Sequence, residues 1–432
     1  MQFQIKENES LEEKVYYTIL DSGLSLYVLP KKGFNKKYAI FSTRFGSIDN
    51  SFRVEGNGEG RVKVPDGVAH FLEHKLFDQE KGNVFDRFAA YGGSPNAFTS
   101  FTQTTYLFSC TDFFPENFEL LLDFVQIPYF TDESVAKEQG IIQQEILMYQ
   151  DNPDWCVFFN LLESLYSEHP VRNDIAGDEE SISLITKDTL YTCYNTFYHP
   201  SNMAIFVTGD LSPQEVLALV RGNMAGKEFP QSKNIQRDYP LEQPEVQRKK
   251  VVKEFSVSQP IVNIGFKDTY SYLEGRELLF RDLACELLLE LIFGKSEPFY
   301  TRLYEEELID ELFSADYIAE CTYGYTLINA RTKDPERLHH EVLMEIDRAK
   351  KEGLKEEDFE RHKRKLRGEL LRCFNSLEFI ANNYLAYRFR GIEFFDILDV
   401  LQNIHLKDLE KILFEHLLEK CHAISIIKPY ER

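Results

Sequence analysis

Residues 70–74 read His70-Phe71-Leu72-Glu73-His74, and this run says more about the fold and function than any other stretch of the chain. Two imidazoles four residues apart lie one above the other on the same face of a helix. This spacing lets one nitrogen of each ring reach a single Zn²⁺ at about 2.0–2.1 Å. Glu73 projects from the same side, where its carboxylate can take a proton from zinc-bound water, whose pKa the metal lowers to roughly 7. The run therefore predicts a helix with a catalytic zinc site.

A chance arrangement is the alternative, since a triplet of this kind arises in roughly two or three of 100 chains with this His and Glu content. The surroundings favour the metal site. The run follows residues 64–67, Val-Pro-Asp-Gly, a turn-rich entry suited to starting a helix. The neighbouring residues are apolar, so the helix should be largely buried. Two His and a Glu are costly to bury without a partner, and a metal ion is the simplest one.

A third protein ligand is needed for zinc, and water takes the fourth position of a catalytic site. The best candidate lies downstream in residues 131–147, a segment that Thr131 or Asp132 can cap as a helix. Glu138 and Glu145 are seven residues apart, so two helical turns place them on one face. One could bind the metal while the other orients a ligand. An ordinary solvated acidic face is the alternative for this pair.

These residues resemble the pitrilysin/insulinase family of zinc metallopeptidases, whose His-x-x-Glu-His order is the inverzincin signature. The segments that carry the resemblance beyond the motif are 65–69, 92–99, 169–170, 198–203 and 209–210. The resemblance implies that His70, His74 and Glu145 hold the zinc ion and that Glu73 is the general base. The resemblance also implies that Glu138 is an acidic residue beside the zinc site. It further implies that Asn96 and Ala97 lie in an edge strand that pairs with the substrate backbone.

The bulk properties fit a cytoplasmic enzyme. A chain of 432 residues with 43% hydrophobic residues is long enough for two or more domains with large cores. No run approaches 18 apolar residues, so no membrane-spanning helix is expected. The first residues lack the basic start and apolar core of a signal peptide. The seven cysteines are scattered and form no disulfide framework, which favours reduced thiols in a cytoplasm.

The formal charge of −22 argues against nucleic acid as a partner, because binding phosphates requires a concentration of Lys and Arg. The one basic cluster, residues 361–367, follows an acidic stretch, and a solvated helix face explains it better than a phosphate site. An acidic surface can favour basic or neutral peptides by steering. We therefore expect a peptide substrate, and neither nucleic acid nor a membrane.

The patterning of the first half favours strands around the motif helix. Residues 24–30 and 38–45 are strand-like, residues 98–108 have the Thr and aromatic content of one β-strand, and residues 203–208 close the first half. The segment 225–249 then collects Gly, Pro and charged residues, as a linker does.

We assign residues 1–228 to an N-terminal zinc-binding peptidase domain, 229–250 to a linker and 251–432 to a C-terminal repeat. Residues 286–293 can be laid on 70–77 at an offset of 216 residues (286 − 70). At this offset the second copy keeps the apolar frame and lacks the zinc motif. A chance likeness between two amphipathic helices is the alternative.

The family resemblance favours duplication, because the domains of this family are such repeats. It implies an α+β fold of two similar α/β sandwich domains. Each domain is expected to have a mostly antiparallel sheet with helices packed on one face.

One departure from the family pattern shapes the functional prediction. Self-sufficient members carry an Arg and a Tyr seven residues apart in the later domain, where they help to bind the substrate carbonyl. Leu308 and Ala315 occupy those places here, and Arg302 has the wrong spacing to both Tyr304 and Tyr317. A lost donor to the carbonyl oxygen typically costs about 10²–10³ in rate. The chain thus resembles the zinc-bearing subunit of a bacterial two-component pair.

We therefore expect a zinc-dependent endopeptidase that hydrolyses peptides or unfolded segments as part of a heterodimer. A homologous zinc-less subunit would supply the Arg and Tyr, and a homodimer is the other possibility. One alternative is a processing or maturation factor, because such pairs resemble bacterial proteins associated with elongation factor P modification. The other is a non-catalytic assembly subunit, against which the retention of all four site residues argues.

Overall fold

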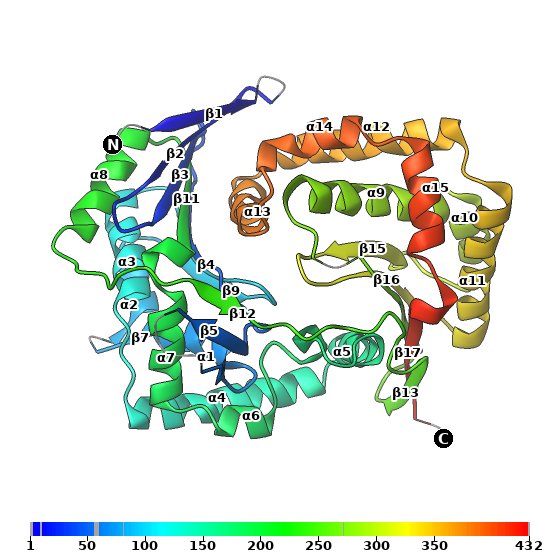
Figure 1. Ribbon diagram of the computed structural model, residues 1–432, viewed down its shortest axis with the longest axis horizontal. Helices are drawn as coiled ribbons and strands as arrows, with labels where there is room; N and C mark the ends of the chain where they lie inside the picture. Colours follow the sequence, from blue (N-terminus) through cyan, green and yellow to red (C-terminus); the bar gives the residue numbers. More distant parts are fainter. Residues whose placement is uncertain (1–2, 9–10, 56–59, 81, 271, 431–432) are drawn as a thin grey trace. The chain divides into compact units, whose positions relative to one another are not determined.

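The computed structural model describes residues 3–8, 11–55, 60–80, 82–270 and 272–430 (Figure 1). The chain forms two compact units, each assembled from separate segments of sequence. The first unit comprises Met1–Ile146, Asp174–Asp238 and Cys373–Phe389, and the second comprises Leu147–Asn173, Tyr239–Arg372 and Arg390–Arg432. These units differ from the predicted continuous ranges 1–228 and 251–432. The difference arises because two helices, at residues 153–165 and 377–389, each pack in the unit formed mainly by the other half of the sequence.

A seven-stranded sheet is the framework of the first unit, with the strand order β1-β2-β3-β11-β4-β10-β9. Its neighbouring strands run antiparallel except for β11 and β3, which are parallel. The strands are β1 (Gln4–Asn8), β2 (Glu13–Ile19), β3 (Ser25–Pro30), β4 (Lys37–Thr43), β9 (Ser94–Thr99), β10 (Thr104–Cys110) and β11 (Met203–Gly209). Two small sheets consist of β5 (Ser51–Val54), β6 (Val62–Lys63) and β12 (Ile235–Arg237), and of β7 (Asp78–Gln79) and β8 (Gly82–Asn83).

Helices of the first unit cover both faces of the large sheet, which is why its central strands are buried along nearly their whole length. The helices are α1 (Val68–Phe77), α2 (Val84–Ala90), α3 (Phe114–Gln126), α4 (Asp132–Gln150), α6 (Glu179–Ser183), α7 (Lys187–Phe197), the short η2 (Pro200–Asn202), α8 (Pro213–Met224) and α13 (Leu377–Phe389). Figure 1 shows α3 and α8 on one side of the sheet and α13 on the other.

The helix α13 comes from the last third of the chain and completes the core of the first unit. Its Tyr384 ring lies 5.1 Å from the ring of Tyr27 in β3 and 4.8 Å from that of Phe206 in β11. On the opposite face, the buried Tyr106 hydroxyl of β10 contacts the Leu72 carbonyl oxygen of α1. Aromatic side chains thus fill both sides of the same sheet.

The second unit contains a five-stranded sheet with the order β13-β17-β14-β16-β15. Its strands are β13 (Lys250–Phe255), β14 (Ile261–Lys267), β15 (Ser314–Ala319), β16 (Gly324–Arg331) and β17 (His422–Pro429). Its helices are α5 (Pro153–Leu165), η1 (Pro170–Arg172), α9 (Gly275–Phe293), α10 (Pro298–Glu305), α11 (Pro335–Glu352), α12 (Glu356–Cys373), η3 (Phe394–Asp396), α14 (Ile397–Gln402), α15 (Leu406–Glu415) and η4 (Glu419–Cys421).

The two sheets share one plan, which agrees with the predicted duplication. The order β3-β11-β4-β10-β9 of the first sheet matches β13-β17-β14-β16-β15 of the second, and in both the first two strands are parallel and the others antiparallel. The offset of 216 residues does not hold for the strands. It is 225 between the starts of β3 and β13 (250 − 25) and 219 between those of β11 and β17 (422 − 203), because the connections differ in length.

The helix α5 belongs to the first half of the sequence but packs on the sheet of the second unit. Gly265 of β14 faces it, and a Cβ atom at this position would lie 2.9 Å from side-chain carbons of Leu161 and Leu165. The absence of a side chain at Gly265 therefore permits this close approach. Together with α13, this helix explains why neither unit is continuous in sequence and why helices cover both faces of each sheet rather than one.

The prediction of one strand over residues 98–108 is wrong in one respect. The chain turns at Ser100–Gln103, where the Ser100 hydroxyl oxygen accepts hydrogen bonds from the backbone N–H groups of Thr102 and Gln103. The segment is therefore the antiparallel hairpin of β9 and β10. Both arms favour extended structure, and a four-residue polar turn between them is a weak signal.

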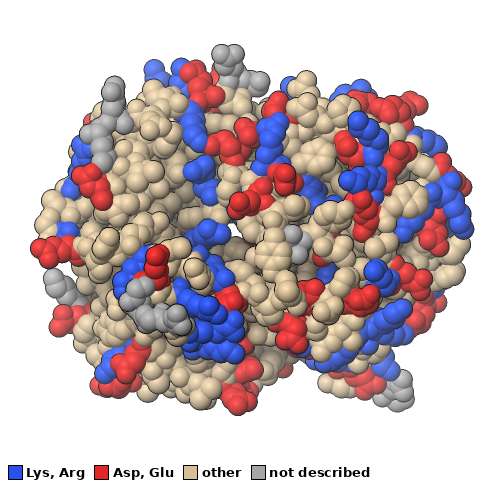
Figure 2. All heavy atoms as spheres, viewed as in Figure 1, with Lys and Arg blue, Asp and Glu red and all other residues tan. Residues whose placement is uncertain are grey.

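Charged side chains of both signs are interspersed on the face shown in Figure 2. Acidic residues outnumber basic ones, 71 against 49. Among the described residues, no helix combines the length and the apolarity that crossing a membrane requires.

A buried imidazole in the second unit predicts a pH-dependent contribution to stability. His362 of α12 lies 3.4 Å from the Glu290 carboxylate and 2.7 Å from that of Glu297. The contact with Glu290, and then that with Glu297, raises the pKa of His362 despite its burial. The protonated ring therefore stabilises the fold fully below about pH 6.5, the ordinary His pKa, and this contribution is lost as the pH rises through the raised pKa.

We expect His362→Gln to lower the midpoint of thermal unfolding more at pH 6 than at pH 9. Comparing the variant with the wild type at each pH cancels the contributions of the other histidines. An equal loss at both pH values would contradict the ionic role of His362.

Candidate metal centre and catalytic site

The helix α1 begins where the sequence predicts, immediately after Gly67. This glycine has φ 84°, a left-handed backbone conformation, and a Cβ atom there would lie 2.3 Å from the Ala176 carbonyl oxygen. Only glycine fits such a turn without strain. Val68, Ala69, Phe71, Leu72 and Leu76 of the helix are buried, as predicted. The entry turn and the apolar residues thus fix the direction in which the three polar side chains project.

The helix α4 supplies the two acidic residues. The Thr131 hydroxyl oxygen accepts a hydrogen bond from the backbone N–H of Ser134, so Thr131 caps this helix and Asp132 is its first residue. The predicted apolar stripe is buried and consists of Val135, Ile142 and Ile146. Glu138 is buried on the same helix, whereas Glu145 is partly exposed. An ordinary solvated face therefore does not describe this pair.

His70, His74 and Glu145 converge in the first unit. One ligand atom of each lies within 4.8 Å of the other two, and no second group of three such side chains occurs in the described ranges. The Glu145 oxygens lie 3.7 Å from His70 Nε2 and 3.4 Å from His74 Nε2. Ligands around a tetrahedral zinc ion at 2.0–2.1 Å are separated by about 3.4 Å. The donor set of two imidazoles and one carboxylate therefore fits zinc in type, and the two distances from Glu145 are close to this separation.

Glu138 orients one of the imidazoles. Its carboxylate lies 3.1 Å from His74 Nδ1, which leaves Nε2 of this ring directed toward Glu145. Burial opposes the charge on His74, but the hydrogen bond to Glu138 and the charge of Glu145 outweigh it and raise its pKa. Carboxylates that hold the second nitrogen of a metal-binding His fix the orientation and the tautomer of the ring.

The second imidazole has a different environment. His70 is 8% exposed, and its buried Nδ1 has no hydrogen-bond partner among the described residues. Burial, and then the charge of His74, lowers the pKa of His70 to about 4. The ring is therefore neutral at neutral pH and can offer a lone pair to a metal ion.

Glu73 lies beside this cluster, and Thr99 of β9 contacts it. The Thr99 hydroxyl donates a hydrogen bond of 2.6 Å to Glu73 Oε2. Burial raises the pKa of Glu73, while the bond from Thr99 acts in the opposite direction. A carboxylate with a raised pKa accepts and returns a proton more readily at neutral pH. Thr99 ends the family-like segment 92–99, but no spacing or motif in the sequence points to its contact with Glu73.

Asn96 and Ala97 lie in β9, the last strand of the seven-stranded sheet, as predicted for an edge strand. The Ala97 N–H donates to the side-chain oxygen of its neighbour Asn96 at 2.9 Å. A peptide that adds to this edge could replace that local bond with one to its own backbone carbonyl. Such strand addition recognises a backbone independently of its side chains.

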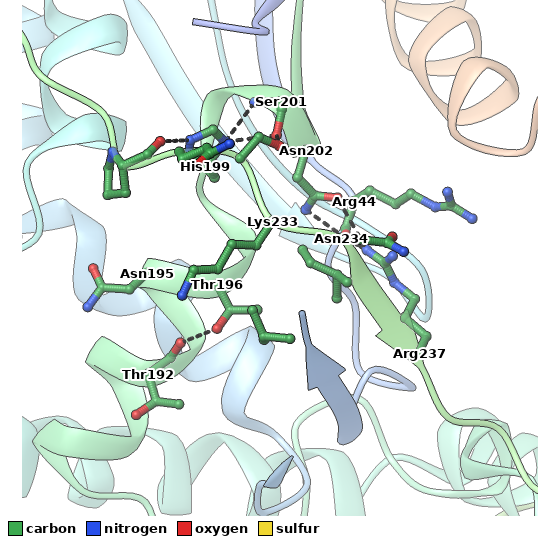
Figure 3. Close-up of a pocket in the computed structure, with 15 residues that line it drawn as sticks. Arg44, Thr192, Asn195, Thr196, His199, Ser201, Asn202, Lys233, Asn234 and Arg237 are labelled. Atoms are coloured by element: carbon green, nitrogen blue, oxygen red, sulfur yellow. Dashed lines mark hydrogen bonds between the residues drawn. The ribbon is translucent and has the colours of Figure 1, made fainter. Parts of the chain in front are cut away.

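A separate hollow of about 900 Å³ in the same unit contains none of these residues (Figure 3). Its wall includes His199, whose Nε2 donates to the Pro230 carbonyl oxygen at 2.8 Å, and Ser201, whose hydroxyl contacts that of Ser232. Figure 3 shows Lys233 extended toward Asn195. The contacts of His199 and Ser201 hold the segment that begins at Pro230 against the end of α7. The family-like run at 198–203 therefore stabilises the fold of this unit.

Arg302 and Tyr317, two side chains of the second unit considered as donors to a substrate carbonyl, both bind carboxylates. The Arg302 guanidinium donates to Glu341 at 2.7 Å, and the Tyr317 hydroxyl donates to the Asp268 carboxylate. Asp268 also accepts two hydrogen bonds from Arg281, at 2.6 and 2.8 Å. Arg302 and Tyr317 are therefore engaged within their own unit.

Comparisons with known proteins place these features in a family. The family model described as insulinase (peptidase family M16) matches residues 63–179, and the model described as the peptidase M16 inactive domain matches residues 184–366. A Bacillus subtilis protein that bears the name uncharacterized zinc protease YmfH is 47% identical over 423 residues, which cover 98% of each chain.

Solved structures agree with this result. The crystal structure of an M16-like protein from Alicyclobacillus acidocaldarius is 38% identical, with a TM-score of 0.93 and coverage of 99% of each chain. Pitrilysin shares the fold at 16% identity and a TM-score of 0.76, and this chain matches 47% of its length. Because both family models match and the Bacillus subtilis relative is similar along almost its entire length, the chain belongs to the insulinase family of peptidases, M16.

Proposed function

We propose that this chain is the zinc-bearing subunit of a zinc-dependent endopeptidase that cleaves peptides or unfolded segments. The observation that carries the proposal is the convergence of His70, His74 and Glu145 beside the carboxylate of Glu73. Membership of a peptidase family and the zinc protease relatives support the same conclusion. A zinc ion at this place would polarise the carbonyl of the peptide bond and lower the pKa of the attacking water.

The side chains of the site would bind the zinc ion, orient one of its ligands and transfer the proton. His70, His74 and Glu145 would hold the ion, and Glu138 would keep the His74 ring in place. Glu73 takes a proton from water as the water oxygen bonds to the carbonyl carbon. It then gives this proton to the amine nitrogen as the C–N bond breaks, so its carboxylate is restored at the end of each cycle.

The edge of β9 is the proposed docking place for the substrate. A peptide extended along this strand would exchange backbone hydrogen bonds with it near Asn96 and Ala97. Because the main chain supplies these bonds, the sequence of the substrate can vary. Unfolded or flexible segments meet this requirement, since their backbone groups are not already paired.

We also propose that a zinc-less homologue completes the site by supplying an Arg and a Tyr to the substrate carbonyl. The positions expected for these residues hold Leu308, which is buried, and Ala315. Arg302 and Tyr317 already bind carboxylates within the second unit. A second copy of this chain would bring the same residues and would not repair the deficit, which favours a heterodimer.

Adding the partner should raise the turnover of a peptide library by about 10²–10³-fold, the usual contribution of one donor to the carbonyl oxygen. The measurement is the cleavage rate of the purified chain alone and of the pair isolated from its native cell. A partner variant with its Arg replaced by Lys and its Tyr by Phe is the control. Equal turnover by the isolated chain would contradict the two-subunit proposal.

A cytoplasmic location completes the proposal. None of the seven cysteines forms a disulfide, and four of them are buried, Cys110 and Cys193 in the first unit and Cys285 and Cys421 in the second. Thiols that remain reduced in this manner are typical of proteins in a reducing compartment.

A further inference from the structure

We propose that Thr99 is a positioning residue for Glu73, and that its hydroxyl decides which carboxylate oxygen carries the proton during cleavage. The inference rests on the proposed function, because that function makes Glu73 the general base. It adds a residue from the substrate-binding edge strand to the machinery of proton transfer. Thr99 does not itself gain or lose a proton.

The direction of the hydrogen bond between Thr99 and Glu73 follows from its neighbours. Thr104 lies opposite Thr99 in the hairpin, with the two hydroxyl oxygens 3.3 Å apart. The Thr104 hydroxyl donates its own proton to the Phe45 carbonyl oxygen at 2.9 Å. Each hydroxyl has a single proton, and an ionised carboxylate only accepts. The Thr99 proton therefore goes to Glu73 Oε2, at the 2.6 Å typical of a hydroxyl bonded to a charged oxygen.

This bond makes the two oxygens of Glu73 unequal. Oε2 is engaged by Thr99, so Oε1 is the oxygen left for the proton of the attacking water. As the O–H bond of water breaks, a new O–H bond forms at Oε1 and the water oxygen bonds to the carbonyl carbon. The same proton then moves from Oε1 to the leaving nitrogen as the C–N bond breaks. No atom is exchanged with Thr99 in either step.

The place of Thr99 in the fold makes it suited to this task. It is the last residue of β9, three positions after Asn96 (99 − 96), and its backbone is held in register with Thr104. A β-branched side chain on a paired strand has restricted rotation about its first bond. The strand proposed to hold the substrate is therefore also the strand that holds the base, which suits a reaction whose groups must be placed within about 0.5 Å of their productive positions.

The test compares Thr99→Val with Thr99→Ser in the chain together with its partner. Val keeps the shape and removes the hydroxyl, and we expect kcat to fall by about 10- to 100-fold with KM nearly unchanged, as for other residues that orient catalytic groups. Ser restores the hydroxyl and should recover activity to within about twofold of the wild type. Thr102→Val removes a half-buried hydroxyl from the same hairpin and should leave kcat unchanged.

A double-mutant cycle then shows whether Thr99 acts through Glu73. In Glu73→Asp the carboxylate is one methylene shorter and does not reach Thr99, so adding Thr99→Val should cost no more than about twofold in kcat. A full 10- to 100-fold loss in this background as well would overturn the inference, because Thr99 would then act independently of Glu73. A Ser variant as slow as the Val variant, or zinc loss from Thr99→Val, would overturn it too.

Failure of this inference is distinguishable from failure of the proposed function. If Thr99→Val is as active as the wild type while Glu73→Gln is inactive, only the role of Thr99 is refuted. If Glu73→Gln cleaves peptides at the parent rate, the assignment of the base itself is refuted, and the inference falls with it.

Discussion

Replacing Glu73 with Gln should abolish peptide cleavage while zinc remains bound. The amide has nearly the same shape as the carboxylate and can still accept a hydrogen bond from Thr99, but it cannot take a proton from water. The loss of a general base typically costs about 10²–10⁴ in kcat. The measurement is kcat on a defined peptide, with the metal content of the same preparation determined by mass spectrometry.

Glu80→Gln is a matched control, because Glu80 is exposed and lies just beyond the end of α1. This variant should keep both zinc and activity. If Glu73→Gln cleaved peptides at the rate of the wild type, another group would have to be the base.

Replacing Glu145 with Gln should remove the metal ion and, with it, all cleavage. The site has three protein ligands in this account, and an uncharged amide is a much poorer ligand for zinc than a carboxylate. Even residues that only orient a ligand contribute about 10- to 100-fold to metal affinity, so a direct ligand should contribute more. Competition with a chelator of known affinity measures the change.

Two further variants on α4 show how much each acidic residue of this helix contributes to zinc affinity. Glu138→Gln should weaken zinc binding by about 10- to 100-fold, because it removes the acidic partner of His74 and leaves the three ligands in place. Glu133→Gln, on the exposed face of the same helix, should leave zinc binding unchanged.

Zinc should also raise the thermal stability of the wild type by mass action but not that of Glu145→Gln. Equal zinc affinity in all three variants would refute the ligand set.

The parts of the site that could be predicted from the sequence are those that depend on spacing within one helix. The positions of His70, Glu73 and His74 on α1, and of Glu138 and Glu145 on α4, follow from the helical period, and the structure brings the two groups together. Which of the two acidic residues faces both imidazoles was implied by the family resemblance alone. Spacing within α4 left that choice open, because seven residues return to the same face.

The features that escaped prediction depend on contacts between distant segments. Thr99 is an ordinary strand residue until the hairpin brings it to Glu73. The helices α5 and α13 have apolar residues that indicate burial, but an apolar face does not specify which sheet it covers. The predicted domain ranges were therefore continuous, whereas each compact unit includes a helix from the other half of the sequence.

The proposed zinc site is tested most directly by a crystal of the zinc-loaded protein measured at the zinc absorption edge. We predict one strong anomalous peak per chain, about 2.0–2.1 Å from Nε2 of His70, Nε2 of His74 and an oxygen of Glu145. A protein that stays free of zinc when excess metal is supplied, or a peak located away from these three atoms, would contradict it.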